Sequence, residues 1–151
     1  MIGRRRFDRS TVVLVVALAI GLPLLLWLGR GLTFFSDEWA FIESRSLGDP
    51  GTWLPPHNEH WSTLPVIAYR LLVETVGLRT YVPYLAVVVA LHGLVVTLVF
   101  VAVRRSSGPF AAVAVAILLL CYGSGFENLY WGFQTGFVGA TAFGVAALLA
   151  L

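Results

Sequence analysis

The strongest constraint on the fold is a set of long apolar runs that carry no charged residue. The first run covers residues 11–29, and as a helix rising about 1.5 Å per residue it nearly spans a hydrocarbon core of about 30 Å. Three similar runs cover residues 80–103, 109–123 and 133–151. Because a backbone inside a bilayer must satisfy its own hydrogen bonds, we expect an all-α, polytopic bundle of about four transmembrane helices.

The composition agrees with a membrane protein. Only 12% of the residues are charged, against about 25% in a typical soluble domain. The net charge of +2 offers no basic field for nucleic acid, and the single cysteine, Cys121, excludes an internal disulfide or a cysteine-based metal site. The chain stays apolar up to Leu151, so we expect residues 1–151 to form a single membrane domain at the N-terminal part of a longer protein.

The arginines predict the orientation of the bundle, because positive residues favour the cytoplasmic side. Six of them cluster before the first apolar run or between the second and third runs: Arg4, Arg5, Arg6, Arg9, Arg104 and Arg105. We therefore expect a multi-pass protein of the cell membrane with a cytoplasmic N-terminus. The segments 30–79 (the long loop) and 123–132 (the short loop) then lie outside the cytoplasm. A cleaved signal peptide is the competing interpretation, which the length of the first run and the lack of a small-residue cleavage motif disfavour.

The long loop begins with a helix signal. Ser36 suits the cap, and Asp37 and Glu38 suit the first turn, where acids stabilise the helix dipole by about 0.3–1 kcal/mol without any chemistry. A turn signal at 48–51 predicts that this helix ends near Leu47.

A second helical pattern follows in the same loop. Its apolar residues recur at helical spacing, and they are Leu64, Ile67, Ala68, Leu71, Leu72 and Val76. Tyr69, Arg70 and Glu74 fall on another face. We expect both helices of the long loop to be interfacial, lying in the plane of the lipid headgroups.

The candidate functional residues concentrate in the two loops. Between the two predicted interfacial helices, a short segment holds His57, Asn58, Glu59 and His60, and imidazoles titrate near neutral pH or bind metals. A solvated polar loop is the alternative interpretation. The pair His57 and His60 lacks a third zinc ligand at fixed spacing. We therefore expect at most a site for Mg²⁺ or Mn²⁺, with these candidate ligands: Asp37, His57, His60 and Glu127.

Acids near the headgroup level are further candidates. Desolvation there can raise the pKa of Asp37 or Glu38 and make a general base. Glu127 and Asn128 lie in the short loop, where an acid between two apolar spans must be exposed or partnered; an ordinary aromatic belt is the alternative. His92 lies within the second apolar run, where we expect a neutral imidazole hydrogen-bonded between helices.

The order of these elements resembles the N-terminal part of GT-C fold glycosyltransferases, polytopic enzymes that use polyprenyl-phosphate sugars. The resemblance rests on a first span followed by Asp37-Glu38, two juxtamembrane helices, and a second acid, Glu127, in the next outer loop. The segments His57–His60 and Phe126–Gln134 are also similar to stretches of bacterial multi-span proteins of that group.

This resemblance implies an inverting transfer of a sugar to an extracytoplasmic acceptor, with Asp37 as the general base. The remaining candidates would orient the acceptor or hold a divalent ion, and they are Glu38, His57, Glu59, His60, Glu127 and Asn128. An arginine of the long loop, Arg45, Arg70 or Arg79, would pair with the donor phosphate. A transporter fragment, indicated only by His92 and Pro23, and a non-catalytic membrane subunit are the rival interpretations.

Overall fold

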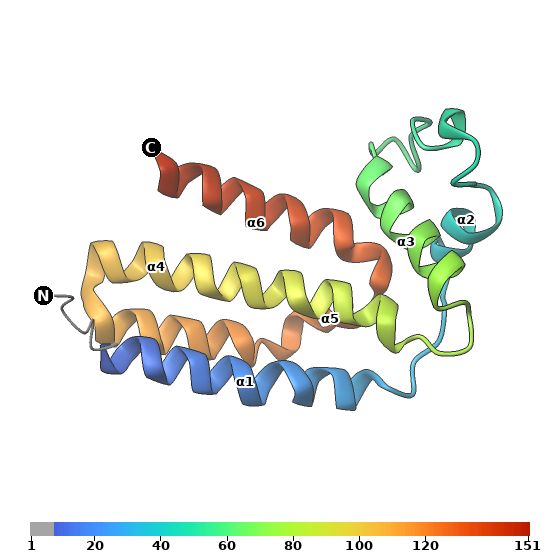
Figure 1. The fold of residues 1–151 in the computed structure, drawn as a ribbon. Helices are drawn as coiled ribbons and strands as arrows, with labels where there is room; N and C mark the ends of the chain where they lie inside the picture. Colours follow the sequence, from blue (N-terminus) through green and yellow to red (C-terminus); the bar gives the residue numbers. More distant parts are fainter. Residues whose placement is uncertain (1–7) are drawn as a thin grey trace, which may run out of the picture.

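The computed structural model describes residues 8–151, so Arg4, Arg5 and Arg6 lie outside the described residues. The described chain is helical and contains no β-sheet (Figure 1). Its elements are α1 (Arg9–Gly29), α2 (Glu38–Glu43), η1 (Pro50–Thr52), α3 (Thr63–Thr75), α4 (Val82–Leu120), η2 (Gly123–Gly125), α5 (Phe126–Tyr130), η3 (Gly132–Gln134) and α6 (Thr135–Ala150). Three segments are long and apolar enough to cross a membrane: Arg9–Gly29, Val82–Leu120 and Gly132–Ala150.

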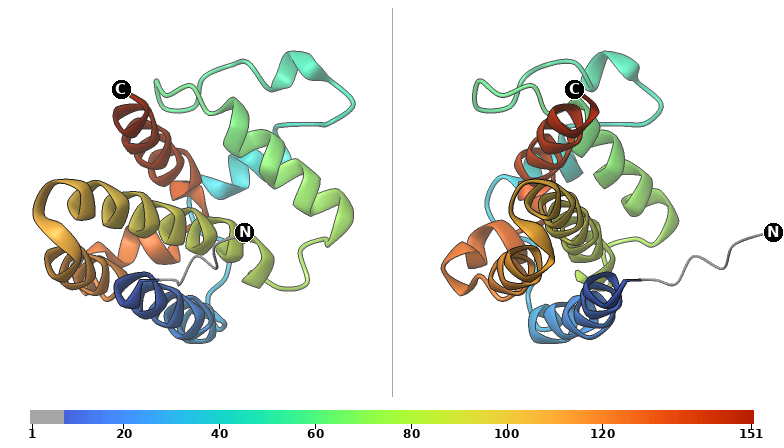
Figure 2. Two further views of the ribbon diagram at one scale, coloured as in Figure 1. Left: turned by 60° about the vertical axis from the view of Figure 1, so that its left-hand side comes forward. Right: turned by 90° about the vertical axis from the view of Figure 1, so that its left-hand side faces the viewer.

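Helix α4 is a hairpin of two helical arms. Gly108 has a φ of 88° and a ψ of 174°, a conformation that glycine adopts without a Cβ penalty, and Pro109 begins the second arm. The chain reverses direction there (Figures 1 and 2). The sequence predicts a turn from Arg104 onward, whereas the helix continues to the residue before Gly108. The second arm, 109–120, is about 18 Å long, which is shorter than a hydrocarbon core of about 30 Å.

Two arginines at the turn of α4 contact the start of α1 and the end of α6 at one end of the bundle. Arg104 lies 2.9 Å from the carboxylate of Asp8 and donates a 2.9 Å hydrogen bond to the Thr11 hydroxyl. Arg105 donates to the carbonyl of Leu149 over 3.0 Å. We call this the arginine end. The long and short loops lie at the opposite end of the bundle, the loop end (Figure 1).

The bundle interior is apolar and closely packed. A cluster towards the arginine end joins α1 to both arms of α4, and it comprises Leu14, Val96, Phe100, Ala112, Ala116 and Leu120. A Cβ atom added at Gly93 of α4 would lie 2.8 Å from Leu22 of α1. Small residues that permit such close approach are typical of helix packing in membranes.

The first helix of the long loop is shorter than the sequence predicts. It ends at Glu43 and not near Leu47. The prediction of a Ser36 cap is also wrong, because Ser36 has a φ of 51° and no side chain caps α2. Instead, the carboxylate of Glu38 turns back and accepts a 2.8 Å hydrogen bond from the backbone N–H of Phe35.

Helix α3 packs against the protein through a different side from the one that carries its predicted apolar stripe. Leu64 and Leu71, expected on its membrane-facing side, have exposed fractions of 70% and 49%. The side that packs against the protein carries Val66 and Tyr69, both buried. Tyr69 lies outside the predicted apolar stripe, so helical periodicity alone does not reveal the residue that connects α3 to the rest of the loop end.

Candidate functional site

The loop end is organised around the carboxylate of Glu38, which is completely buried. Its Oε1 atom accepts hydrogen bonds from the hydroxyls of Tyr69 and Tyr81, the latter over 2.6 Å. Burial raises the pKa of Glu38, and the hydrogen bonds from the two phenols oppose that shift. Burial and the neighbouring Glu38 also raise the pKa of both phenols, which therefore stay protonated as donors.

The short loop is attached to this cluster. The backbone N–H of Gly132 donates to the Tyr81 hydroxyl over 2.6 Å. A Cβ atom at Gly132 would lie 2.8 Å from Glu38 Oε1, so only glycine allows the backbone to approach this closely. Trp131 Nε1 donates to the carbonyl of Phe35 over 3.3 Å, and the two rings lie 5.9 Å apart. The Glu38 cluster, comprising Glu38, Tyr69, Tyr81 and Gly132, thus joins both loops.

Asp37, the residue before Glu38, has a different environment. Its Oδ1 atom lies 3.7 Å from Nε2 of His57, and the side chains are 32% and 14% exposed, respectively. Its Oδ2 atom accepts a 3.2 Å hydrogen bond from Asn58 Nδ2. The structure therefore places the solvent-accessible carboxylate of Asp37 beside the imidazole of His57. The next residue in the sequence, Glu38, carries the buried carboxylate.

A tight hairpin presents this imidazole. The backbones of His57 and His60 exchange two hydrogen bonds of 2.9 Å. The two residues between them, Asn58 and Glu59, have φ angles of 47° and 67°, as in a type I′ turn. Glu59 is exposed at the tip of this turn.

Aromatic rings surround the two histidines. The ring of His57 lies 5.3 Å from Phe41 and 5.6 Å from Phe133, whereas His60 faces Phe137 of α6 at 5.3 Å. Within residues 8–151, no three His, Cys, Asp or Glu side chains gather as a possible metal site. The four candidate ligands for a divalent cation are therefore not brought together as a group of three or more in this part of the chain.

The arginines of the long loop differ in availability. Arg70 donates to the carbonyl of Ile42 over 2.6 Å and pairs with Glu74 at 2.8 Å. Arg45 donates to carbonyls between Thr52 and Pro56. Arg79 is exposed and makes none of the hydrogen bonds or ion pairs found among the described residues. The Arg70 guanidinium thus holds α2 against α3 and is less available for a phosphate than that of Arg79.

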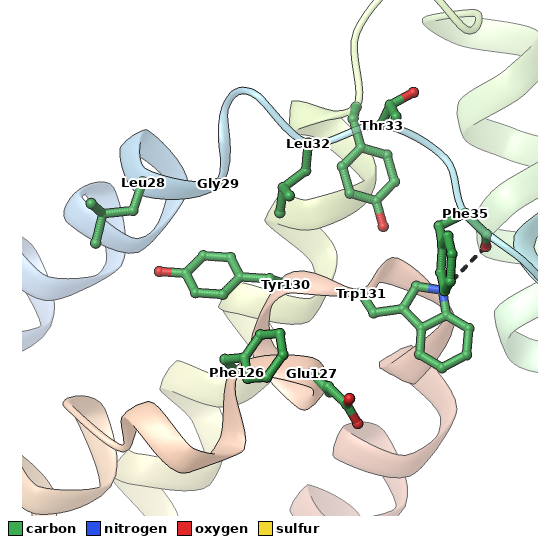
Figure 3. Close-up of a pocket in the computed structure, with 10 residues that line it drawn as sticks. Leu28, Gly29, Leu32, Thr33, Phe35, Phe126, Glu127, Tyr130 and Trp131 are labelled. Atoms are coloured by element: carbon green, nitrogen blue, oxygen red, sulfur yellow. Dashed lines mark hydrogen bonds between the residues drawn. The ribbon is translucent and has the colours of Figure 1, made fainter.

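Glu127 is exposed and lines a groove of about 710 Å³ between the end of α1 and α5 (Figure 3). Phe35 and Tyr81 belong to the same lining, so the groove adjoins the Glu38 cluster. Asp37, His57 and His60 do not line it. The structure brings Glu127 to the loop end with the other acids but on a different surface from the Asp37–His57 pair.

Asn128 and His92 line a separate cavity of about 220 Å³ between α4, α5 and α6. The Nε2 atom of His92 is buried, and among the described residues it has no hydrogen-bond partner. Asn128 is therefore placed with the mid-helix histidine and not with Asp37.

Sequence reasoning missed Tyr69, Tyr81 and Gly132 as members of the site. Tyr81 lies at the start of the apolar run 80–103, where tyrosine is typical of the membrane interface, and this position gives no sign of a carboxylate partner. A comparison with known proteins adds no assignment: no protein-family model, no curated protein and no solved structure matches the chain.

Proposed function

We propose that this chain acts in a membrane glycosyltransferase of the GT-C type, which transfers a sugar from a polyprenyl-phosphate donor to an acceptor hydroxyl. The observation that carries this proposal is the accessible Asp37–His57 pair at the loop end, 3.7 Å apart. The order of the acids along the chain, which resembles that of this group of enzymes, also supports the proposal. The arginine end then lies in the cytoplasm, as the positive-inside rule favours, and the reaction takes place on the other face.

In the proposed reaction, Asp37 acts as general base. Its carboxylate takes the proton of the acceptor hydroxyl as the acceptor oxygen attacks the anomeric carbon of the donor sugar. The bond between that carbon and the phosphate oxygen breaks, its electron pair stays on the phosphate, and polyprenyl phosphate leaves. A single displacement of this kind inverts the anomeric configuration.

The neighbouring side chains have supporting roles in this proposal. His57 lies beside Asp37 and orients its carboxylate, together with the amide of Asn58. Glu38 is a positioning residue, because it is buried and its oxygens are occupied by donors. Arg79 is the arginine of the long loop that remains available for the donor phosphate.

Replacing Asp37 by asparagine tests the base assignment. Asparagine keeps the size of the side chain and cannot take the proton, so release of polyprenyl phosphate should fall by about 10²–10⁴-fold. The assay uses membranes containing the full chain, supplied with a panel of polyprenyl-phosphate sugars. Asp49→Asn is the matched control, since Asp49 is exposed in the same loop and its carboxylate accepts a bond from the Gly51 N–H alone. Unchanged release by a folded Asp37→Asn variant would refute the proposal.

A further inference from the structure

The groove beside the Glu38 cluster has a distinctive combination of shape and charge. Its walls come from the last turn of α1, the segment after it, and α5. Leu28 and Leu32 form one side, and Phe126, Tyr130 and Trp131 the other (Figure 3). Leu28, in the last turn of α1, is 55% exposed, and Leu32, three residues after the helix ends, is 43% exposed. An alkyl chain lying along these residues would cover apolar surface that the protein itself leaves open.

Among the described residues, Glu127 is the one charged residue that lines the groove. Figure 3 shows its carboxylate on the side of Phe126 and Trp131, away from the Tyr130 hydroxyl. No basic residue of the part of the chain that the structure describes belongs to the lining. Arg30 lies between the lining residues Gly29 and Leu32 in the sequence, but its guanidinium is bound to Trp27. It lies 4.0 Å above the ring of Trp27 and donates to the Trp27 carbonyl over 2.5 Å.

This charge arrangement discriminates between headgroups. An anionic group near Glu127 would meet a carboxylate without a compensating cation. An ammonium group would gain an ion pair with Glu127 and contact with aromatic faces, which attract cations within about 6 Å of the ring centre. The apolar walls favour a chain-bearing lipid over a free solute.

We propose that the groove binds a membrane lipid with a primary-amine headgroup, whose ammonium pairs with Glu127 and whose acyl chain lies along Leu28 and Leu32. This site is independent of the proposed sugar transfer, since Asp37 and His57 do not line the groove.

The test compares phosphatidylethanolamine with phosphatidylglycerol of identical acyl chains. Both lipids carry a phosphate, and they differ in the ammonium group. The full chain is placed in nanodiscs containing equal amounts of the two lipids, and the lipids that remain bound are counted by native mass spectrometry. The variant is Glu127→Gln, and the matched control is Glu43→Gln, because Glu43 is exposed at the same end and does not line the groove.

The quantity compared is the ratio of bound phosphatidylethanolamine to bound phosphatidylglycerol. We expect this ratio to be roughly two- to fivefold larger for the native chain and for Glu43→Gln than for Glu127→Gln, which is the range that an exposed ion pair supplies. Equal ratios in all three proteins would mean non-selective annular lipid and would overturn the proposal. A preference for the amine lipid that survives Glu127→Gln, or an equal loss in Glu43→Gln, would overturn it as well.

Discussion

Replacing Tyr81 by phenylalanine tests the cluster that joins the two loops. The Tyr81 hydroxyl donates to Glu38 and accepts from the N–H of Gly132, each over 2.6 Å, so phenylalanine keeps the ring and removes both bonds. Loss of a hydrogen bond to a carboxylate costs about 1.5–3 kcal/mol, and a buried N–H left without a partner costs about 1–3 kcal/mol. Together they should lower the free energy of unfolding by roughly 2.5–6 kcal/mol.

Two other tyrosines provide the scale for this measurement. Tyr84→Phe removes one neutral bond, from its hydroxyl to the Gly77 carbonyl over 3.1 Å, and should cost about 0.5–1.5 kcal/mol. Tyr69→Phe should fall between the two variants, because Glu38 keeps the bond from Tyr81. Unfolding in a mild detergent near neutral pH, followed by the loss of helical circular dichroism, measures all three.

The reasoning fails if Tyr81→Phe is no less stable than Tyr84→Phe. A double-mutant cycle provides a second check. Tyr81→Phe combined with Glu38→Gln should be less costly than the sum of the single variants by about 1 kcal/mol or more, since the two residues share a bond. Strict additivity would contradict a shared cluster.

Three further predictions concern the same region. Gly132→Ala should lower the free energy of unfolding by about 1–3 kcal/mol because its methyl group would meet the Glu38 cluster, whereas Gly144→Ala, in open space on a helix, should be neutral or stabilising; equal melting temperatures would contradict this. Glu59→Gly should raise the melting temperature, since glycine relieves the positive φ at the hairpin tip, and a fall would contradict the turn assignment. Because burial raises the pKa of Glu38, the folded chain holds its proton more tightly than the unfolded chain does. The resulting stabilisation is complete below the unfolded pKa of about 4.3 and is lost as the pH rises through the folded pKa. Detergent unfolding across a pH series should therefore show the native chain losing stability relative to Glu38→Gln as the pH rises. A gain in stability relative to Glu38→Gln would refute this prediction.

The sequence predicts the helices of the bundle well because their cause is local. An uncharged apolar run in a bilayer must be helical wherever it occurs, and residues 11–29 accordingly fall within α1. The reversal between the second and third apolar runs is also marked locally, by Gly108 followed by Pro109. Only its exact position was missed, because Arg104 and its neighbours remain helical.

The interior of the site could not be predicted because its cause is not local. Glu38 is buried by tyrosines that lie 31 and 43 residues further along the chain. Helical periodicity places Tyr69 outside the apolar stripe of its helix, yet a phenol can pack inward when its hydroxyl meets a carboxylate. Asp37 and Glu38 look equivalent in the sequence, and only the fold separates an accessible carboxylate from a buried one.

The most direct test of the account is crosslinking between the two loops in native membranes. Phe35→Cys and Trp131→Cys are combined in a Cys121→Ser background and treated with a short bismaleimide; Ser107→Cys with Trp131→Cys is the comparison pair from opposite ends of the bundle. The account predicts efficient crosslinking within the chain for the first pair and none for the second. Failure of the first pair to crosslink, or equal crosslinking of both, would contradict a shared loop end held together by Glu38.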